Sequence, residues 1–168
     1  RVGFYSEAVK VAAGRVFVFA AGYFPQAPPP LRAALPCTAT VIDPRREWIE
    51  RLPDGVARVV AAHPPDEVAK LADDAFVLCM TQGHSSDLPV LVEIFRRERP
   101  LPFVGVIGSD AKAAVLRKEL AAAGVPTERI AFHCPVGLPL GTNHPAEIAV
   151  SIAAQLLQVR DALQGAIR

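Results

Sequence analysis

Short apolar runs alternate with segments of helical pattern along the chain, and this alternation most constrains the fold. The apolar runs predict six short buried strands, at residues 15–20, 38–42, 58–62, 75–80, 103–107 and 130–133. They are continuous rather than alternating, as in parallel sheets that are covered on both faces. Helices are predicted at residues 47–52, 65–71, 88–97, 109–123 and 145–163. The sequence therefore predicts an α/β fold, with a doubly wound, mostly parallel sheet of about six strands and helices on both faces.

Two of the helices have well-marked starts. Ser109 is expected to cap the helix that ends at Gly124. Proline disfavours the helical conformation in the residue before it, so His144 is expected to be the cap residue and Pro145 the first helical residue. One apolar stripe then runs along the last helix at spacings of three or four, and it comprises Ile148, Ile152, Leu156, Val159 and Leu163.

Composition excludes several classes of protein. The 168 residues are expected to form one domain, residues 1–14 being a leading segment, and the net charge of +1 argues against a general nucleic-acid binder. The densest basic cluster, Arg96–Arg99, is interpreted as a solvated helix end. No apolar run approaches the ~18 residues of a membrane span. Cys37, Cys79 and Cys134 lack metal-site spacing and are too few for a disulfide framework, which predicts a cytoplasmic protein.

Ligands of doubly wound sheets bind beyond the carboxyl ends of the strands. Five segments with polar or glycine-rich residues follow predicted strands directly, and they span residues 21–30, 43–46, 81–87, 108–112 and 134–143. The sequence thus predicts a ligand site at this edge of the sheet.

The first of these segments resembles a dinucleotide-binding turn that has been altered. Ala20, Gly22 and Pro25 occupy the three glycine positions of the motif, and three consecutive prolines follow where the phosphate-binding helix should begin. Asp43 lies 21 residues after Gly22, at the spacing of a ribose-binding acid. Because proline removes an N–H donor from the phosphate site, the sequence predicts that NAD(P) binds poorly.

Two further segments carry polar side chains at strand ends. Thr81, His84 and Asp87 offer a hydroxyl, an imidazole and a carboxylate; the alternative is a turn in which Ser85, Ser86 or Asp87 caps the next helix. Gly108, Ser109 and Lys112 form either an anion site at a helix start or a plain capped helix.

The last segment is the most unusual. Cys134 ends the sixth predicted strand and opens a loop that contains Gly137 and Gly141. A thiolate there would bind a soft metal or carry sulfur, and the partial positive charge of the following helix start would favour it. Cys79, inside an apolar strand, is expected to be inert, and a buried unreactive thiol remains the alternative for Cys134.

Together these segments resemble the carboxy-terminal, Rossmann-like domain of the xanthine dehydrogenase accessory family (XdhC/CoxI type). The resemblance rests on VFVFAAG from Val16, VIDPR from Val41, the turn at 81–87, GVIGS from Gly105, HCPVGLPLG from His133 and HPAEIAVSIAAQLL from His144.

The resemblance implies a chaperone for the molybdenum cofactor rather than an enzyme. Such a protein binds the cofactor, supports exchange of an oxo ligand for the terminal sulfur, and delivers it to a xanthine dehydrogenase-like enzyme. Cys134 would carry the sulfur or metal chemistry. Binding is assigned to ten residues: Gly22, Asp43, Thr81, His84, Asp87, Gly108, Ser109, Lys112, Gly137 and Gly141. A cysteine desulfurase as sulfur donor, a homodimer and an amino-terminal domain beyond this chain are also implied.

The departures from the family pattern fall at positions expected to face the ligand. Ala20 and Tyr23 replace residues of the usual glycine-rich turn, Gln82 stands where a first histidine is usual, and Val115 replaces a basic residue. Two alternatives therefore stay open: an NAD(P)-dependent oxidoreductase domain and a non-catalytic dimerisation or docking module.

Overall fold

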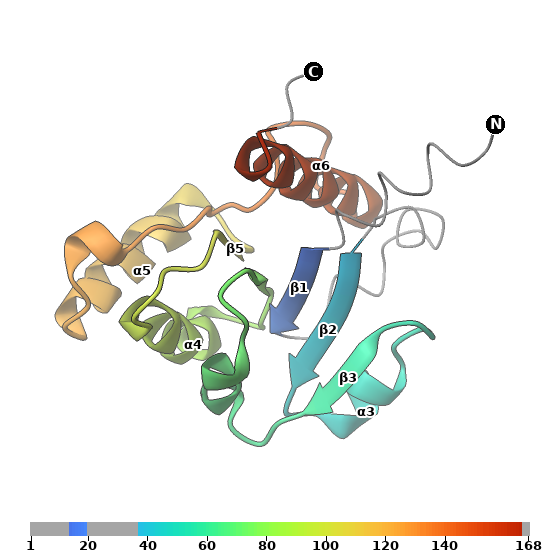
Figure 1. The fold of residues 1–168 in the computed structure, drawn as a ribbon, viewed down its shortest axis with the longest axis horizontal. Helices are drawn as coiled ribbons and strands as arrows, with labels where there is room; N and C mark the ends of the chain where they lie inside the picture. Colours follow the sequence, from blue (N-terminus) through green and yellow to red (C-terminus); the bar gives the residue numbers. More distant parts are fainter. Residues whose placement is uncertain (1–13, 20–36, 166–168) are drawn as a thin grey trace.

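Five parallel strands form the centre of the molecule. The computed structural model describes residues 14–19 and 37–165, and Figure 1 shows their arrangement. The strands are β1 (Gly14–Phe19), β2 (Cys37–Asp43), β3 (Ala57–Val60), β4 (Phe76–Cys79) and β5 (Phe103–Val106). Their order is β3-β2-β1-β4-β5, so the chain moves outward from β1 in one direction and then in the other. The predicted doubly wound α/β fold is confirmed.

The sixth predicted strand is reduced to a single bridge. His133 pairs in parallel with Gly105 of β5, and its N–H donates to the Val104 carbonyl at 2.9 Å. The short 3-10 helix η3 (Thr127–Arg129) precedes it and a cis Cys134–Pro135 bond follows it. Only a few residues between these two features are left to pair, so the segment continues the sheet without forming a strand.

The helices fall close to their predicted positions. They are α3 (Arg46–Glu50), η2 (Pro64–Lys70, a 3-10 helix), α4 (His84–Arg96), α5 (Asp110–Ala122) and α6 (Pro145–Leu163). The last has the predicted bounds, whereas α4 begins four residues before the predicted start. None of the helices in the described part of the chain is long and apolar enough to cross a membrane.

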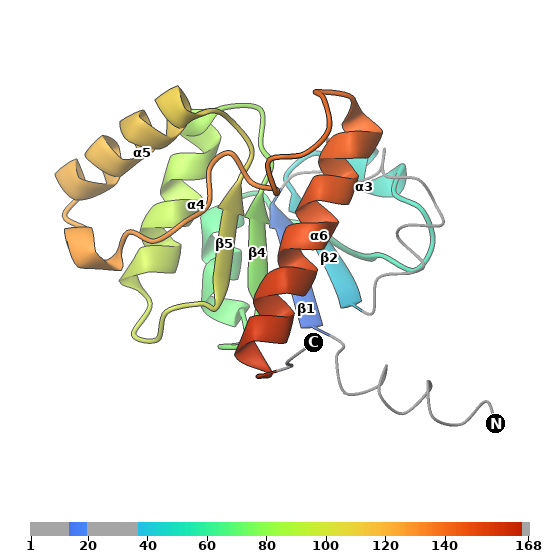
Figure 2. The same ribbon diagram turned by 90° about the horizontal axis from the view of Figure 1, so that it is seen from above.

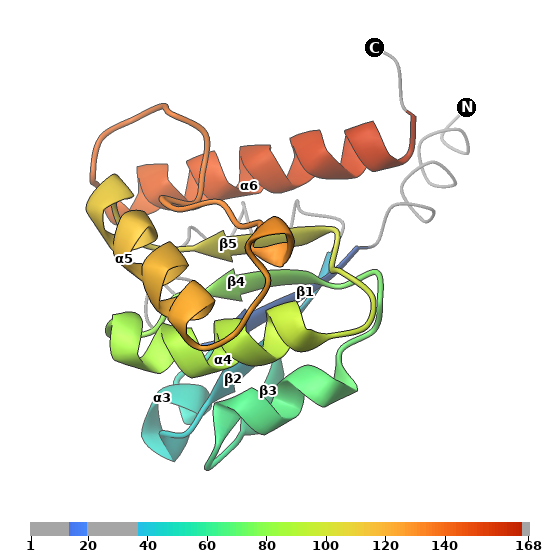
Figure 3. The same cartoon turned by 90° about the vertical axis from the view of Figure 1, so that its left-hand side faces the viewer.

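Alternate residues of the strands build two separate cores. Val18 of β1 packs with Leu78 of β4 and Ile152 of α6, on the face that α3 and α6 cover. The adjacent Phe19 packs with Leu91 of α4 on the other face, which α4, α5 and η2 cover. Figures 1 and 3 show α6 lying apart from α4 and α5. Both faces are covered, which explains the continuous apolar strands.

The two predicted helix caps are confirmed. Ser109 Oγ accepts from the Lys112 N–H at 3.2 Å, and His144 Nδ1 accepts from the Ala146 N–H at 3.3 Å. The apolar stripe of α6 is less complete than predicted, because Leu163 in the last turn is 60% exposed. The buried contact of this helix therefore ends one turn before its carboxyl end.

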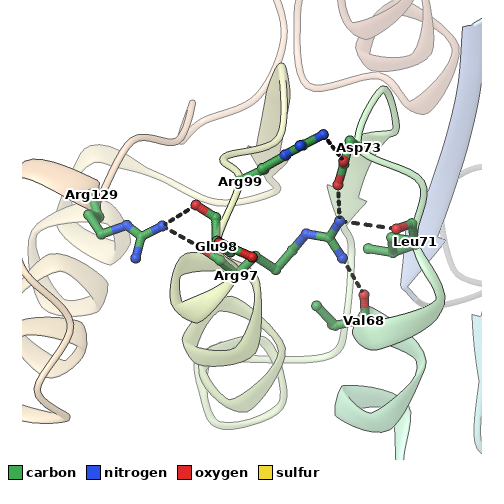
Figure 4. Close-up of polar contacts among 7 residues, drawn as sticks. All are labelled: Val68, Leu71, Asp73, Arg97, Glu98, Arg99 and Arg129. Atoms are coloured by element: carbon green, nitrogen blue, oxygen red, sulfur yellow. Dashed lines mark hydrogen bonds and ion pairs between the residues drawn. The ribbon is translucent and has the colours of Figure 1, made fainter.

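The basic cluster at the end of α4 is solvated as predicted except at Arg97, whose contacts are drawn in Figure 4. The Arg97 side chain is only 15% exposed. Its Nη1 donates to the Val68 carbonyl at 2.8 Å, and its Nη2 donates to the Leu71 carbonyl at 3.1 Å and to Asp73 Oδ1 at 2.9 Å. Arg129 donates in turn to the carbonyls of Arg97 and Glu98. Arg97 thus fastens η2, and Arg129 fastens η3, to the end of α4 at the amino edge of the sheet.

Candidate carboxyl-edge site

The carboxyl ends of the strands bring most of the predicted residues to one edge. Figure 2 draws β1, β4 and β5 pointing toward this edge, where the loop before α6 also lies. Thr81 follows β4, Gly108 follows β5 and Cys134 follows the bridge to β5. Gly22 lies outside the described residues.

Asp87 is the centre of a buried polar network. Its side chain is fully buried, and its Oδ1 accepts from the Thr81 hydroxyl at 2.6 Å. Its Oδ2 accepts from Lys112 Nζ at 2.6 Å, and the same ammonium donates to the Ile107 carbonyl at 2.7 Å. The helix start at Gly83 has no side-chain cap, so the alternative of a capping turn at residues 85–87 is wrong. Asp87 instead ties the loop after β4 to the start of α5.

Cys134 lies beside this network. A Cβ atom added to Gly108 would come within 2.5 Å of Lys112 Cδ and 3.3 Å of Cys134 Sγ. Because Gly108 has no Cβ, the Lys112 side chain and the Cys134 sulfur can both approach its backbone. The Cys134 thiol donates to the Ser109 carbonyl at 3.6 Å, so the sulfur meets the start of α5 rather than the start of α6.

The environment of Cys134 does not favour a thiolate. Burial raises the pKa of the thiol, and the positive charges of Lys112 and Arg117 only partly offset this effect. The predicted stabilisation of a thiolate by the last helix is therefore wrong. Cys79 is fully buried, and burial raises its pKa well above the ordinary value, which confirms that it is inert.

His84 lies at the carboxyl edge but points elsewhere. It is the first residue of α4, and its Nε2 is 3.8 Å from Glu119 Oε1 on α5. The side chain is 53% exposed. Within the described residues, its polar contact is with α5 and not with Asp87, Lys112 or Cys134.

Gly137 and Gly141 have packing roles. Gly137 has φ +107°, a Cβ there would collide with Ser151 Oγ, and its N–H donates to Gln155 Oε1 at 2.7 Å. Gly141 has φ +77° and lies against Glu147. Both glycines bring the loop close to α6. The contact between Gly137 and Gln155 was not predicted from the sequence, because the two residues are 18 positions apart.

Asp43 lies on the other side of β1, with Arg45. The carboxylate is 2% exposed and accepts from Arg45 Nε at 2.8 Å and from Arg45 Nη2 at 2.7 Å. Both residues line a pocket of about 310 Å³ between the loops that follow β2, β3 and β4. The other lining residues are Phe19, Ile42, Pro44, His63, Pro64, Pro65, Thr81, Gln82, Ser86, Pro89 and Val90. Thr81 therefore belongs both to this pocket and to the Asp87 network.

Sequence analysis placed Arg45 in a segment expected at the site but assigned it no role, and it missed His63 as a pocket residue. His63 directly follows the strand predicted at residues 58–62, so its place after a predicted strand was an available signal. Arg45 stands two residues after Asp43, and its role depends on the folded turn.

Comparison with known proteins identifies the family. Residues 16–156 match the XdhC Rossmann domain family. The chain belongs to this family. The matched range begins within β1, includes β2 to β5 of this XdhC-family domain and ends within α6.

Two relatives are considerably longer than this XdhC-family chain. The Escherichia coli (strain K12) uncharacterized protein YqeB is 33% identical over 102 residues, which is 60% of this chain and 18% of YqeB. A Bacillus halodurans protein whose crystal structure is described as that of a xanthine dehydrogenase has a TM-score of 0.71 and 30% identity. That match covers 93% of this chain and 44% of the other. The chain therefore spans less than half of each relative.

No group of three His, Cys, Asp or Glu side chains in the described part of this XdhC-family domain could hold a metal ion. The polar chemistry of the described carboxyl edge consists of the half-buried thiol of Cys134, the ammonium of Lys112, the hydroxyl of Thr81 and the Asp43–Arg45 pair.

Proposed function

We propose that this domain binds the molybdenum cofactor and acts as an accessory factor for a xanthine dehydrogenase-like enzyme. The observation that carries the proposal is the meeting of Cys134, Lys112 and Gly108 at the carboxyl edge of an XdhC-family Rossmann domain. A ligand at this edge would meet a thiol and a cation beside the same glycine. Similarity to the Bacillus halodurans protein supports the connection with xanthine dehydrogenases.

The residues present fit this cofactor better than they fit a bare metal. The cofactor brings its own sulfur ligands to molybdenum, so the protein needs to supply only a contact and not a full ligand set. Because a Cβ at Gly108 would come within 2.5 Å of Lys112 Cδ, only a glycine lets the backbone lie directly against both the lysine stem and the Cys134 sulfur. Cys134, Lys112 and the backbone of Gly108 and Ser109 would hold that end of the cofactor, which supplies the oxo and sulfido chemistry when bound.

Cys134 must lose a proton before it donates electrons from sulfur. Burial keeps the pKa of the thiol raised, so the neutral form dominates in the free protein. Lys112 is the nearest compensating charge, and its ammonium is held in place by Asp87 and the Ile107 carbonyl. The thiolate fraction would therefore depend on the Asp87–Lys112 pair.

The proposal extends to partners and location. We infer that the protein works in the cytoplasm as a homodimer, receives sulfur from a cysteine desulfurase, and delivers the cofactor without catalysing turnover itself. NAD(P) is expected to bind weakly, because Pro25 and the prolines that follow it replace phosphate-binding N–H groups.

The test measures bound pterin directly. The purified 168-residue chain is incubated with molybdenum cofactor, separated from free ligand and oxidised, and the released pterin is quantified by fluorescence. The proposal predicts pterin on the unmutated chain and a strong reduction in Cys134→Ala. Cys79→Ala is the matched control, because it removes a thiol that is fully buried and inert.

A second readout is activation of a client dehydrogenase by the loaded protein. Retained pterin together with retained activation in Cys134→Ala would show that the thiol is structural. Absence of pterin on the unmutated chain would overturn the proposed function for this domain.

A further inference from the structure

The pocket beside Asp43 has the dimensions and lining of a small-molecule site. Its volume of about 310 Å³ lies at the lower end of the range for ligand pockets. Three prolines from separate segments line the pocket with rigid apolar rings: Pro44 in the loop after β2, Pro64 at the start of η2 and Pro89 in α4. The pocket opens where the chain turns from β1 toward β2 on one side and β4 on the other, which is where doubly wound sheets bind ligands. A flat heterocycle suits such a space.

Arg45 lies at this pocket and is held on two sides. Its Nε and Nη2 donate to the two oxygens of Asp43, at 2.8 and 2.7 Å. Its guanidinium also stacks over the ring of Trp48, 4.8 Å from the centroid. The side chain remains 27% exposed. Because these contacts fix the orientation of the guanidinium, little conformational freedom is left for a ligand to remove.

Fixing Arg45 in this way leaves donors for a ligand. A guanidinium has five N–H donors, and the bonds to Asp43 use one on Nε and one on Nη2. Within the described residues, Nη1 makes no hydrogen bond. The bond to Asp43 also raises the pKa of Arg45, so the group is always charged. A charged fork with unused donors is suited to the oxygens of a phosphate.

We propose that Arg45, held by Asp43 and Trp48, anchors the phosphomonoester of a ligand whose flat heterocycle fills the adjacent pocket. Two ligands carry this chemistry: molybdopterin, a pterin with a terminal phosphate, and a nucleotide with a 2′-phosphate, for which an arginine after the second strand is a known solution in dinucleotide-binding folds. With molybdopterin as the ligand, the inference rests on the proposed function and deepens it. It also gives Asp43 the role of orienting Arg45 rather than of binding ribose.

Neighbouring carboxylates limit the strength of this anchor. Asp43 neutralises Arg45 in the count of charges, and Glu47 adds a further negative charge nearby. The phosphate therefore gains from directed N–H donors rather than from a net positive field. Charge-assisted hydrogen bonds of this kind correspond to about a tenfold to a hundredfold difference in affinity.

The test compares each ligand with its dephosphorylated form. The probes are the oxidised fluorescent pterin of molybdopterin before and after phosphatase treatment, and adenosine 2′-monophosphate against adenosine. Binding to the 168-residue chain is measured by fluorescence or calorimetry. The phosphorylated form of at least one pair should bind about tenfold to a hundredfold more tightly, and Arg45→Gln should abolish that preference.

Two variants keep the result interpretable. Arg51→Gln is the matched control, because Arg51 lies 5.8 Å from the centroid of the same Trp48 ring but does not line the pocket. The preference of this variant for the phosphorylated ligand should stay within about twofold of that of the unmutated chain. The double variant Asp43→Asn/Arg45→Gln removes the buried charge of Asp43 together with the arginine that pairs with it, and it should lose the preference for phosphate while remaining folded.

The outcomes separate this inference from the proposed function. An Arg45-dependent preference for adenosine 2′-monophosphate alone would support the anchor and count against the molybdenum cofactor. If the chain binds pterin and still prefers the phosphorylated form in both Arg45 variants, the proposed role of Arg45 is wrong and the proposed function stands. Absence of any preference for phosphate in the unmutated chain would overturn the anchor.

Discussion

The two edges of the sheet use similar basic side chains in different ways. At the amino edge, Arg97 donates to two backbone carbonyls and to Asp73, and these contacts join η2 to α4. At the carboxyl edge, Lys112 and Arg45 each pair with a buried carboxylate beside a pocket or a thiol. A basic residue that satisfies backbone carbonyls stabilises the fold, whereas one held by a buried carboxylate remains oriented toward a ligand. Mutation at the amino edge is therefore expected to reduce stability alone, whereas mutation at the carboxyl edge is expected to reduce ligand binding as well.

The largest effect on stability is expected at Lys112. Lys112→Met leaves the fully buried carboxylate of Asp87 without its cation, which should lower the free energy of unfolding by about 3–5 kcal/mol. Denaturant unfolding measures this change. The double variant Asp87→Asn/Lys112→Met removes the unpaired charge, and it should recover at least half of the loss. A single variant as stable as the unmutated chain would show that the pair does not hold the edge together.

Arg97→Ala is expected to cost slightly less. It removes three hydrogen bonds and leaves the Val68 and Leu71 carbonyls without this donor, so the free energy of unfolding should fall by about 2–4 kcal/mol. Arg99→Ala is the matched control: Arg99 also pairs with Asp73, but its side chain is 77% exposed, and its loss should cost less than about 1 kcal/mol. Equal losses in the two variants would contradict the structural role of Arg97.

Gly137→Ala tests how tightly the loop before α6 packs at the carboxyl edge. An alanine at this position must adopt φ +107°, and its Cβ would collide with Ser151 Oγ. Together these effects should lower the free energy of unfolding by about 1–3 kcal/mol. Gly55→Ala is the matched control, because Gly55 has φ +85° but nothing lies within 4 Å of the added Cβ. Thermal unfolding should show the larger loss for Gly137→Ala. Equal losses would mean that the loop moves freely away from α6.

The smallest expected effect is on the ionisation of Cys134. Burial raises the pKa of its thiol, so the rate of alkylation should rise with pH and reach half its maximum above the pKa of a free cysteine. Arg117→Gln removes a charge that lowers this pKa and should shift the midpoint upward by a few tenths of a pH unit. Asp110→Asn should shift it downward, since Asp110 raises the pKa.

The alkylation is measured in a Cys37→Ser background, where the buried Cys79 should not react in the native state. A midpoint below that of a free cysteine would contradict the structure around Cys134. Shifts of the same sign in both charge variants would contradict the electrostatic explanation.

Features that depend on neighbouring residues were predictable from the sequence, and features that depend on distant ones were not. The start of α6 and its cap at His144 follow from a local proline, and the parallel, doubly wound sheet follows from the alternation of elements. Arg97 contacts residues 24 to 29 positions away, and no local pattern distinguishes such a residue from an exposed one.

The sequence predicted the position of the candidate site more fully than the contacts within it. Thr81, Asp87, Gly108 and Lys112 gather as their places after strands require. The neighbour of Cys134 was misassigned because α6 follows it in sequence, whereas folding places the sulfur at the start of α5. His84 was grouped with Asp87 by spacing alone, but the first turn of α4 directs it toward Glu119.

The most direct test compares cofactor binding by variants of the two edges. Molybdopterin bound per folded chain is measured by pterin fluorescence for Arg97→Ala and for Asp87→Asn/Lys112→Met, with the folded fraction taken from circular dichroism. The account predicts that Arg97→Ala binds within about twofold of the unmutated chain, while the carboxyl-edge variant loses about tenfold or more. Equal losses in the two variants, or a greater loss in Arg97→Ala, would contradict it.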